Sequence, residues 1–158
     1  MPVQRFLSAQ SDPFTGFDAA LGEIRAGRKT GHWIWYVFPQ LSGLGGSAMS
    51  QRYGVAGVEE AVEYLRHPEL CERLLTITTA AADQLRAGQS VERLMGSSID
   101  ARKLVSSLTL FGAVARRLFL AEGQPAHDGL ARVADEVLAA AAAQGHPPCR
   151  FTIDQLDQ

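Results

Sequence analysis

Apolar residues recur every three or four positions through most of the chain, which is the pattern of amphipathic helices. The pattern is clearest over Val58–Leu65, Leu70–Leu85 and Leu104–Leu118, and glycines, prolines and capping residues separate these segments. No fixed-period repeat or low-complexity linker interrupts it. We therefore predict an all-α fold, with a single compact domain of six to eight helices over residues 1–158.

The first helix is expected to start at Asp12, a good capping residue, with Pro13 in its first turn. Phe14 then begins an apolar face, and Gly27 is a typical helix end. Residues 1–11 show little pattern. The sequence therefore predicts a helix that starts at Asp12 and ends at Gly27, and it gives no assignment for residues 1–11.

The C-terminal part is predicted to hold one more helix. Asp128 is expected to cap it, and the alanines up to Ala143 need little packing room. The pair Pro147-Pro148 cannot continue a helix. We expect the chain from there to Gln158 to run extended over the surface.

An unusual stretch, from Gly31 to Gly54, holds both tryptophans and several glycines. Its aromatic and β-branched part, His32–Phe38, favours a strand by propensity. The segment is short, ends at Pro39 and lies among helices, so we interpret it as a short buried helix, with Thr30 as a candidate cap.

A glycine-rich loop follows, and Ser47 is expected to cap a short helix that ends at Tyr53. Residues 43–48, GLGGSA, fit the GxGxxA pattern of dinucleotide-binding loops. Pro39 separates them from the aromatic run, and no further βαβ units follow, so a dinucleotide fold is disfavoured. Two interpretations remain, a plain connecting loop or an anion site at the N–H groups of 45–47.

Composition narrows the function classes. The formal net charge of −2 gives no electrostatic case for nucleic-acid binding. The two cysteines and four histidines show no paired spacing typical of metal ligands, and no cofactor motif is present, so neither metal nor cofactor is expected. The first residues do not resemble a signal peptide, and no apolar run spans a membrane. We expect a cytoplasmic protein.

Two groups of side chains are candidates for a site. His32 is either a capping residue or an acid–base group, and the neighbouring aromatics are either core or a stacking wall. In the long helix predicted from Ile99 to about Ala121, Asp100, Lys103 and Ser107 share one face. Serine and threonine in mid-helix lower helix propensity and need a reason. That reason is either an interhelical hydrogen bond or a polar stripe facing an anion.

Three strings of this sequence resemble one family, the domain of unknown function 1810. They are HWIWYVFPQLSGLGGSAMSQRYG, YLRHPELCERL and DARKLVSSLTLF, and the similarity covers about residues 6–122. The resemblance implies an all-helical fold of uncharacterised bacterial proteins, some of which carry the label calpastatin. It brings no activity with it. The chain departs from the family pattern after Gly123, so 123–158 is a separate C-terminal helix and tail.

Two functional hypotheses follow. The first is a pocket for a small anionic or nucleotide-like ligand, hydrolytic if it is catalytic, to which residues 123–158 contribute little. The second is a non-catalytic module that binds a protein partner through the C-terminal helix and tail. The sequence leaves open whether the protein is an enzyme. For the pocket, the candidate catalytic residues are His32 and Lys103, and the candidate ligand-binding residues are Trp33, Trp35, Gln40, Ser47, Ser50, Tyr53, Ser106 and Ser107.

Overall fold

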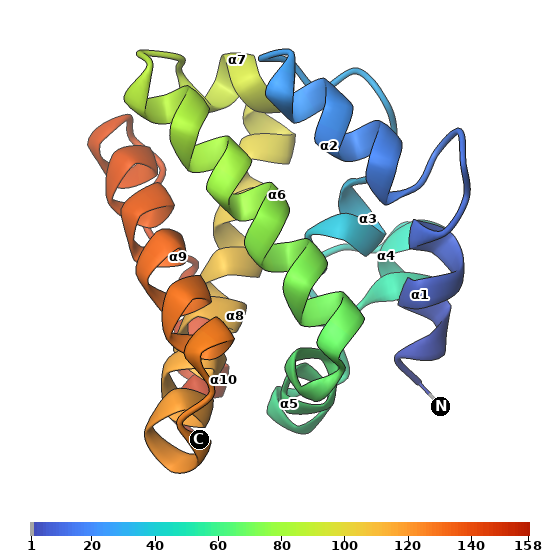
Figure 1. Ribbon diagram of the computed structural model, residues 1–158, viewed down its shortest axis with the longest axis vertical. Helices are drawn as coiled ribbons and strands as arrows, with labels where there is room; N and C mark the ends of the chain where they lie inside the picture. The colour runs from blue at the N-terminus through green and yellow to red at the C-terminus, as the bar shows by residue number, and fades with distance from the viewer. Residues whose placement is uncertain (1) are drawn as a thin grey trace.

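Ten α-helices and no β-strand make up residues 2–158, the part of the chain that the computed structural model describes (Figure 1). The all-α prediction is confirmed, but the number of helices is ten rather than six to eight. The additional helices are short ones at the two ends of the chain. The elements are α1 (Gln4–Gln10), α2 (Phe17–Arg25), α3 (Ile34–Val37), α4 (Ala48–Tyr53), α5 (Val58–Arg66), α6 (Pro68–Arg86), α7 (Val91–Met95), α8 (Ser98–Glu122), α9 (Pro125–Ala143) and α10 (Arg150–Leu156).

The long helices α6, α8 and α9 form the frame of the molecule. In Figure 1, α6 lies between α9 on one side and α1 to α4 on the other. Helix α8 packs along α9 and also contacts α3, α5, α7 and α10. Its inward side chains, including Leu104, Leu108 and Phe111, are fully buried. Because so many elements rest on α8, its position fixes theirs.

The ends of α8 follow from its sequence. The Ser97 hydroxyl accepts the Asp100 N–H at 3.0 Å and caps the first turn. Gly123, at φ +74°, takes the left-handed conformation that ends the helix. Helix α8 is long and apolar enough, by length and composition alone, to cross a membrane. However, 67% of its apolar window is buried inside the protein, as expected of a central core helix.

Aromatic rings join the N-terminal helices to this frame. Phe6 of α1 meets Tyr64 of α5 edge to face, with ring centroids 5.2 Å apart. Tyr64 then contacts Phe111 of α8 at 4.8 Å. Tyr36 and Tyr53 pair at 5.2 Å beside them. One buried cluster therefore runs through all ten helices.

The predicted start of the first helix is wrong. Asp12 accepts the N–H groups of Phe14 and Thr15 at 2.8 and 2.9 Å and closes a turn instead. Helix α2 begins later, at Phe17, and leaves Phe14 85% exposed. The end of the helix is as predicted, because Gly27 has φ +93°.

The stretch before Asp12, in which the sequence shows little pattern, contains helix α1 at residues 4–10. Buried Gln10 donates to the Tyr36 carbonyl at 2.7 Å and to the Tyr64 hydroxyl at 3.0 Å. A seven-residue helix has little stability of its own. Tertiary contacts of this kind hold it in place.

The C-terminal prediction needs two corrections. Helix α9 starts at Pro125, and Asp128 lies in its first turn, paired with Arg132 at 2.9 Å, rather than at the cap. The tail is not extended, because residues 150–156 form α10 against α8. Arg117 of α8 donates to the Leu156 carbonyl at 2.9 Å. This contact places α10 beside the C-terminal half of α8.

The predictions for the Gly31–Gly54 stretch are largely confirmed. Residues 34–37 form a short buried helix, although Trp33 rather than Thr30 occupies its N-cap position. The Ser47 hydroxyl caps α4 by accepting the Ser50 N–H at 3.1 Å. The GLGGSA segment is thus a connecting loop that leads into a capped helix.

Candidate functional site

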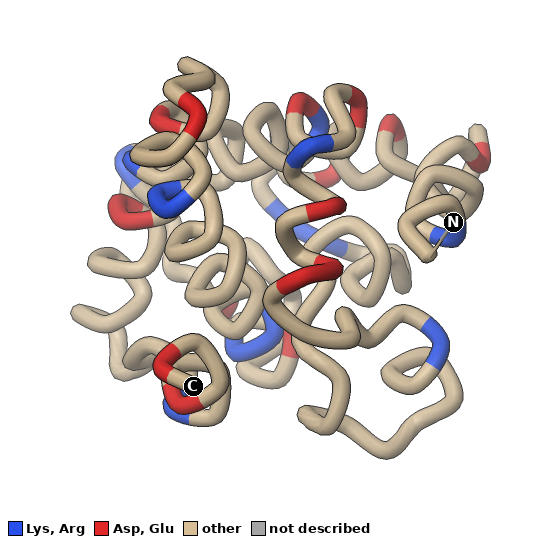
Figure 2. Tube along the Cα trace, turned by 90° about the horizontal axis from the view of Figure 1, so that it is seen from below, with Lys and Arg blue, Asp and Glu red and all other residues tan. Residues whose placement is uncertain are grey.

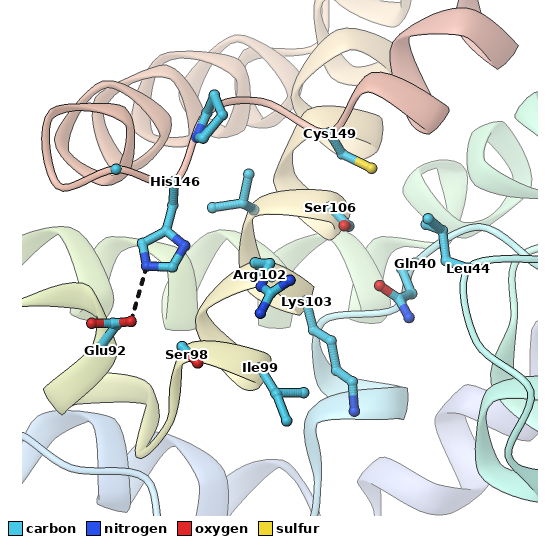
Figure 3. A pocket seen from close by; sticks show the side chains of 13 residues that line it. Gln40, Leu44, Glu92, Ser98, Ile99, Arg102, Lys103, Ser106, His146 and Cys149 are labelled. Carbon is cyan, nitrogen blue, oxygen red and sulfur yellow. Dashed lines mark ion pairs between the residues drawn. The ribbon is translucent and has the colours of Figure 1, made fainter.

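A cavity of about 740 Å³ lies over the first half of α8 (Figure 3). Its floor is α8 itself. Its walls come from α7, from the loop after α3, and from the segment between α9 and α10. The lining residues are Ser98, Ile99, Arg102, Lys103, Val105 and Ser106 of the floor, with Glu92, Gln40, Leu44, Gly145, His146, Pro147 and Cys149 of the walls.

Helical spacing explains the floor. Ile99, Arg102, Lys103 and Ser106 are three or four positions apart, so they project from one face of α8. Figure 3 shows Arg102 and Lys103 between the His146–Glu92 pair on one side and Gln40 on the other. The middle of the cavity is therefore its most cationic part.

The charges near the floor leave an excess of positive charge. Lys103 Nζ is 3.7 Å from one oxygen of Asp100, and Lys29 Nζ is 2.7 Å from the other. One carboxylate therefore serves two ammonium groups. Arg102 is exposed and has no carboxylate partner among residues 2–158. In the facing wall, Glu92 is 3.3 Å from His146, which is charged only when protonated.

The Lys103 side chain is also held by an aromatic ring. Its Nζ lies 4.5 Å from the centroid of the Trp35 ring, a distance typical of cation–π contacts. A narrow crevice lies between them and α4, with an accessible volume of about 10 Å³. That is at most the space of one water molecule. The Trp35 ring, which is half-buried, thus borders this crevice and is not part of the cavity lining.

The cavity wall between α9 and α10 is fixed to α8 by mid-helix hydroxyl groups of the kind that the sequence analysis singled out. Thr109 Oγ1 accepts the Cys149 N–H at 3.2 Å and donates to the Val105 carbonyl at 2.7 Å. Burial alone would raise the pKa of the Cys149 thiol. Hydrogen bonds from the Ser106 hydroxyl and from the first N–H groups of α10 outweigh it, so that pKa is lowered. Ser106 and Thr109 therefore bond to the N-cap residue of α10, which is the interhelical hydrogen bonding expected as one alternative for these mid-helix hydroxyl groups.

The structure divides the predicted site residues into three groups. Gln40, Lys103 and Ser106 line the cavity. Trp35, Ser50 and Tyr53 line only the crevice beside it, which Gln40 and Lys103 also border. The remaining four, His32, Trp33, Ser47 and Ser107, line neither.

Three residues of that last group have local surroundings that account for them, whereas the Ser107 hydroxyl is buried without a hydrogen-bond partner among residues 2–158. Trp33 is 1% exposed, and its indole N–H donates to Glu23 at 2.9 Å. Ser107 is fully buried in the core, Ser47 caps α4, and His32 lies on the surface. His32, Lys103 and Tyr53 therefore do not converge on one cavity. The arrangement offers no His32–Lys103 catalytic pair.

Sequence reasoning missed Ile99, Arg102, His146 and Cys149. Arg102 and Ile99 could have been found by extending the polar stripe of Lys103 and Ser106 by one turn. His146 and Cys149 gave no usable signal, because only the fold brings the C-terminal segment back over α8. The idea that residues 123–158 contribute little to the pocket is wrong, since 145–149 supply a wall.

Acidic and basic residues are interspersed along the chain, as Figure 2 shows, in keeping with the small net charge. Within residues 2–158, no three His, Cys, Asp or Glu side chains gather in the geometry of a metal site. The cavity therefore offers two cations, one carboxylate next to a histidine, neutral hydrogen-bonding groups and one thiol.

Comparison with known proteins agrees with the family resemblance. None of the curated proteins matches the chain. A crystal structure of a conserved hypothetical protein, Rv1873 from Mycobacterium tuberculosis, is 35% identical, with a TM-score of 0.74 over 96% of this chain and 94% of that one. The family described as protein of unknown function (DUF1810) matches residues 1–124. The chain therefore belongs to the DUF1810 family.

Proposed function

We propose that this protein binds a small anionic ligand in the cavity over α8. The observation that carries the proposal is the placement of Arg102 and Lys103, adjacent cations, on the floor of one concave site. Asp100 is shared with Lys29 and neutralises them only in part. A bound anion would supply the missing negative charge.

The neutral groups of the cavity suit the same ligand. Gln40 and Ser98 can each donate a hydrogen bond to an oxyanion. The one carboxylate in the lining, Glu92, is paired with His146. An anion at Arg102 would thus face hydrogen-bond donors, with the acidic group turned to its own partner (Figure 3).

Binding is better supported than hydrolysis. A thiol nucleophile needs a base within hydrogen-bond reach, and Figure 3 shows His146 directed toward Glu92, away from Cys149. Hydrolysis of a bound ligand stays a prediction from sequence, as do stacking of a flat ring and a cytoplasmic location. The alternative of a protein-binding tail has less support, because residues 145–149 serve as a cavity wall and α10 is docked on α8.

The test is a thermal-shift and calorimetry panel of inorganic phosphate, sugar phosphates, AMP and ADP-ribose. A ligand present at about 100 times its Kd should add roughly 2.7 kcal/mol of stability, a shift of about 5–10 °C for a chain of this size. Arg102→Gln should weaken the binding of any hit about tenfold, the lower end for a charge-assisted hydrogen bond because Arg102 is exposed.

Two controls make the result specific. Arg116→Gln removes the same charge from the other half of α8 and should leave the Kd unchanged. His32→Ala should also bind normally, because His32 lies outside the cavity. Absence of binding by every compound, or equal losses in Arg102→Gln and Arg116→Gln, would contradict the proposal.

A further inference from the structure

The apolar part of the cavity indicates what kind of anion it takes. Ile99, next to the two cations, is 61% exposed, although isoleucine is among the residues most often buried. It is one of four large hydrophobic side chains that are exposed among residues 2–158. An exposed isoleucine inside a concave site gains most when a ligand covers it.

A second exposed hydrophobic residue lies close to a wall of the cavity but outside its lining. Phe151, 38% exposed, follows the wall residue Cys149 by two positions. Its ring is against Gly43, where an added Cβ would come 3.3 Å from the Phe151 Cζ. Gly43 precedes Leu44, another wall residue. Ile99 is therefore exposed inside the cavity, whereas Phe151 lies beside the Gly43–Leu44 segment without being part of the lining.

The apolar lining is aliphatic. Ile99, Leu44, Val105 and Pro147 contribute to it, and no Trp, Tyr or Phe is among the described lining residues. The nearby Trp35 ring lies under the Lys103 ammonium group and borders a crevice too narrow for a ligand ring. A nucleobase would find no aromatic face in the cavity, whereas a hydrocarbon chain would contact carbon on several sides.

From this arrangement we propose that the ligand is an amphiphilic anion: an oxyanion head at Arg102 and Lys103, carried by a short aliphatic body that covers Ile99. This inference rests on the proposed anion site and specifies its substrate class. The head group is a carboxylate or a phosphate ester, and the body is a chain or branched alkyl group rather than a flat ring.

A homologous series tests the aliphatic body. Calorimetry would use n-alkyl phosphates and n-alkyl carboxylates of increasing length, with inorganic phosphate and AMP as references. Each methylene that is buried should lower the Kd about threefold to fourfold, until the chain fills the cavity. The series that binds with the lower Kd, alkyl phosphates or alkyl carboxylates, identifies the head group.

Two matched variants separate the head from the body. Ile99→Ser should flatten the dependence on chain length, while Leu120→Ser, which removes an exposed apolar side chain from the far end of α8, should leave it intact. Arg102→Gln should weaken every member by the same factor. Binding that is independent of chain length, or AMP binding more tightly than every alkyl phosphate, would overturn the amphiphile and leave the anion site standing.

Two remaining outcomes are also decisive. Failure of every anion, inorganic phosphate included, would refute both proposals together. Sedimentation with phosphatidylcholine vesicles, with and without phosphatidic acid, separates a free ligand from a membrane lipid. We expect the protein to stay in the supernatant. Co-sedimentation that needs phosphatidic acid and is lost in Ile99→Ser would contradict a free ligand.

Discussion

The hydrogen bond between Thr109 and Cys149 should control how firmly the C-terminal segment closes the cavity. Thr109→Val keeps the shape of the side chain but removes the oxygen that accepts the Cys149 N–H at 3.2 Å. Thr109 is 7% exposed, so water cannot easily replace the lost acceptor. An unsatisfied donor in such a place costs about 1–3 kcal/mol.

Undocking of the segment should absorb that cost. Helix α10 has seven residues and is held by few contacts, chiefly buried Thr152 and Leu156 and the Arg117 bond to the Leu156 carbonyl. A loss of 1–3 kcal/mol in docking raises the undocked population about 5-fold to 150-fold, while that population stays small. The rest of the frame does not depend on this bond, so its Tm should change little.

Limited trypsin digestion measures the undocked population. Cleavage after Arg150, the first residue of α10, requires the segment to open, and its rate follows the open fraction when closing is fast. Release of the 151–158 peptide, followed by mass spectrometry, should therefore accelerate by the same 5-fold to 150-fold.

Thr79→Val is the matched control for this experiment. The Thr79 hydroxyl also donates to a carbonyl in its own helix, that of Leu75 at 2.7 Å, but it lies on α6 away from the tail. Cleavage after Arg150 should be unchanged in this variant. Equal cleavage rates in wild type and Thr109→Val would refute the reasoning, because the bond would then contribute nothing to docking.

Three further predictions concern other parts of the molecule. Hydrogen bonds outweigh burial and lower the pKa of Cys149, whereas burial raises that of Cys71. Alkylation of Cys149 by iodoacetamide should therefore persist to lower pH than that of Cys71, and Ser106→Ala should shift the pH profile of Cys149 alkylation upward. Identical pH profiles for the two thiols would contradict this. Burial alone would raise the pKa of Glu23, but hydrogen bonds from the N–H groups of Gly31, Thr30 and Trp33 outweigh it and lower that pKa. The stability that this carboxylate contributes is therefore present above its unfolded pKa and lost as pH falls through the lowered folded pKa. In chemical denaturation, the stability of Glu23→Gln should approach that of wild type in acid, and a stability difference that stays constant at all pH values would refute the linkage. In Gly22→Ala an added Cβ meets nothing within 4 Å, so this variant should raise Tm by about 1–4 °C. In Gly112→Val the Cβ alone would come 3.1 Å from the Ala134 Cβ, so this variant should lose about 1–3 kcal/mol of stability. Calorimetric scans in which both variants shift Tm in the same direction would be incompatible with the packing described.

The long helices were predictable because each buries one face over many turns. The periodic apolar residues of α6 and α8, and caps such as Ser47, favour the same helices locally that the packed core requires. The short helices α1 and α10 were not predictable, because a seven-residue helix depends on distant partners. Gln10 needs Tyr36 and Tyr64, and α10 needs Thr109 and Arg117.

The candidate site was predictable only in part, for a related reason. Lys103 and Ser106 were found because helical spacing puts them on one polar face. His32 and Trp33 were chosen for chemical type, and neither residue type reports which way its side chain points. Trp33 turns into the core and binds Glu23, while the wall opposite Lys103 comes from residues more than forty positions along the chain. Sequence periodicity contains no information about such a return.

The cavity wall at 145–149 lies beyond the segment that the family shares with this chain, residues 1–124, whereas the floor on α8 lies within it. Recognition in the proposed site is thus divided between the part of the chain that matches the family and the segment that follows it. A chimera that joined this floor to a different C-terminal segment would keep the contacts to the charged head and present a new surface to the hydrocarbon body. Ligand preference in such proteins would then change on grafting only the segment that follows α9, with the buried frame of α6, α8 and α9 left as it is.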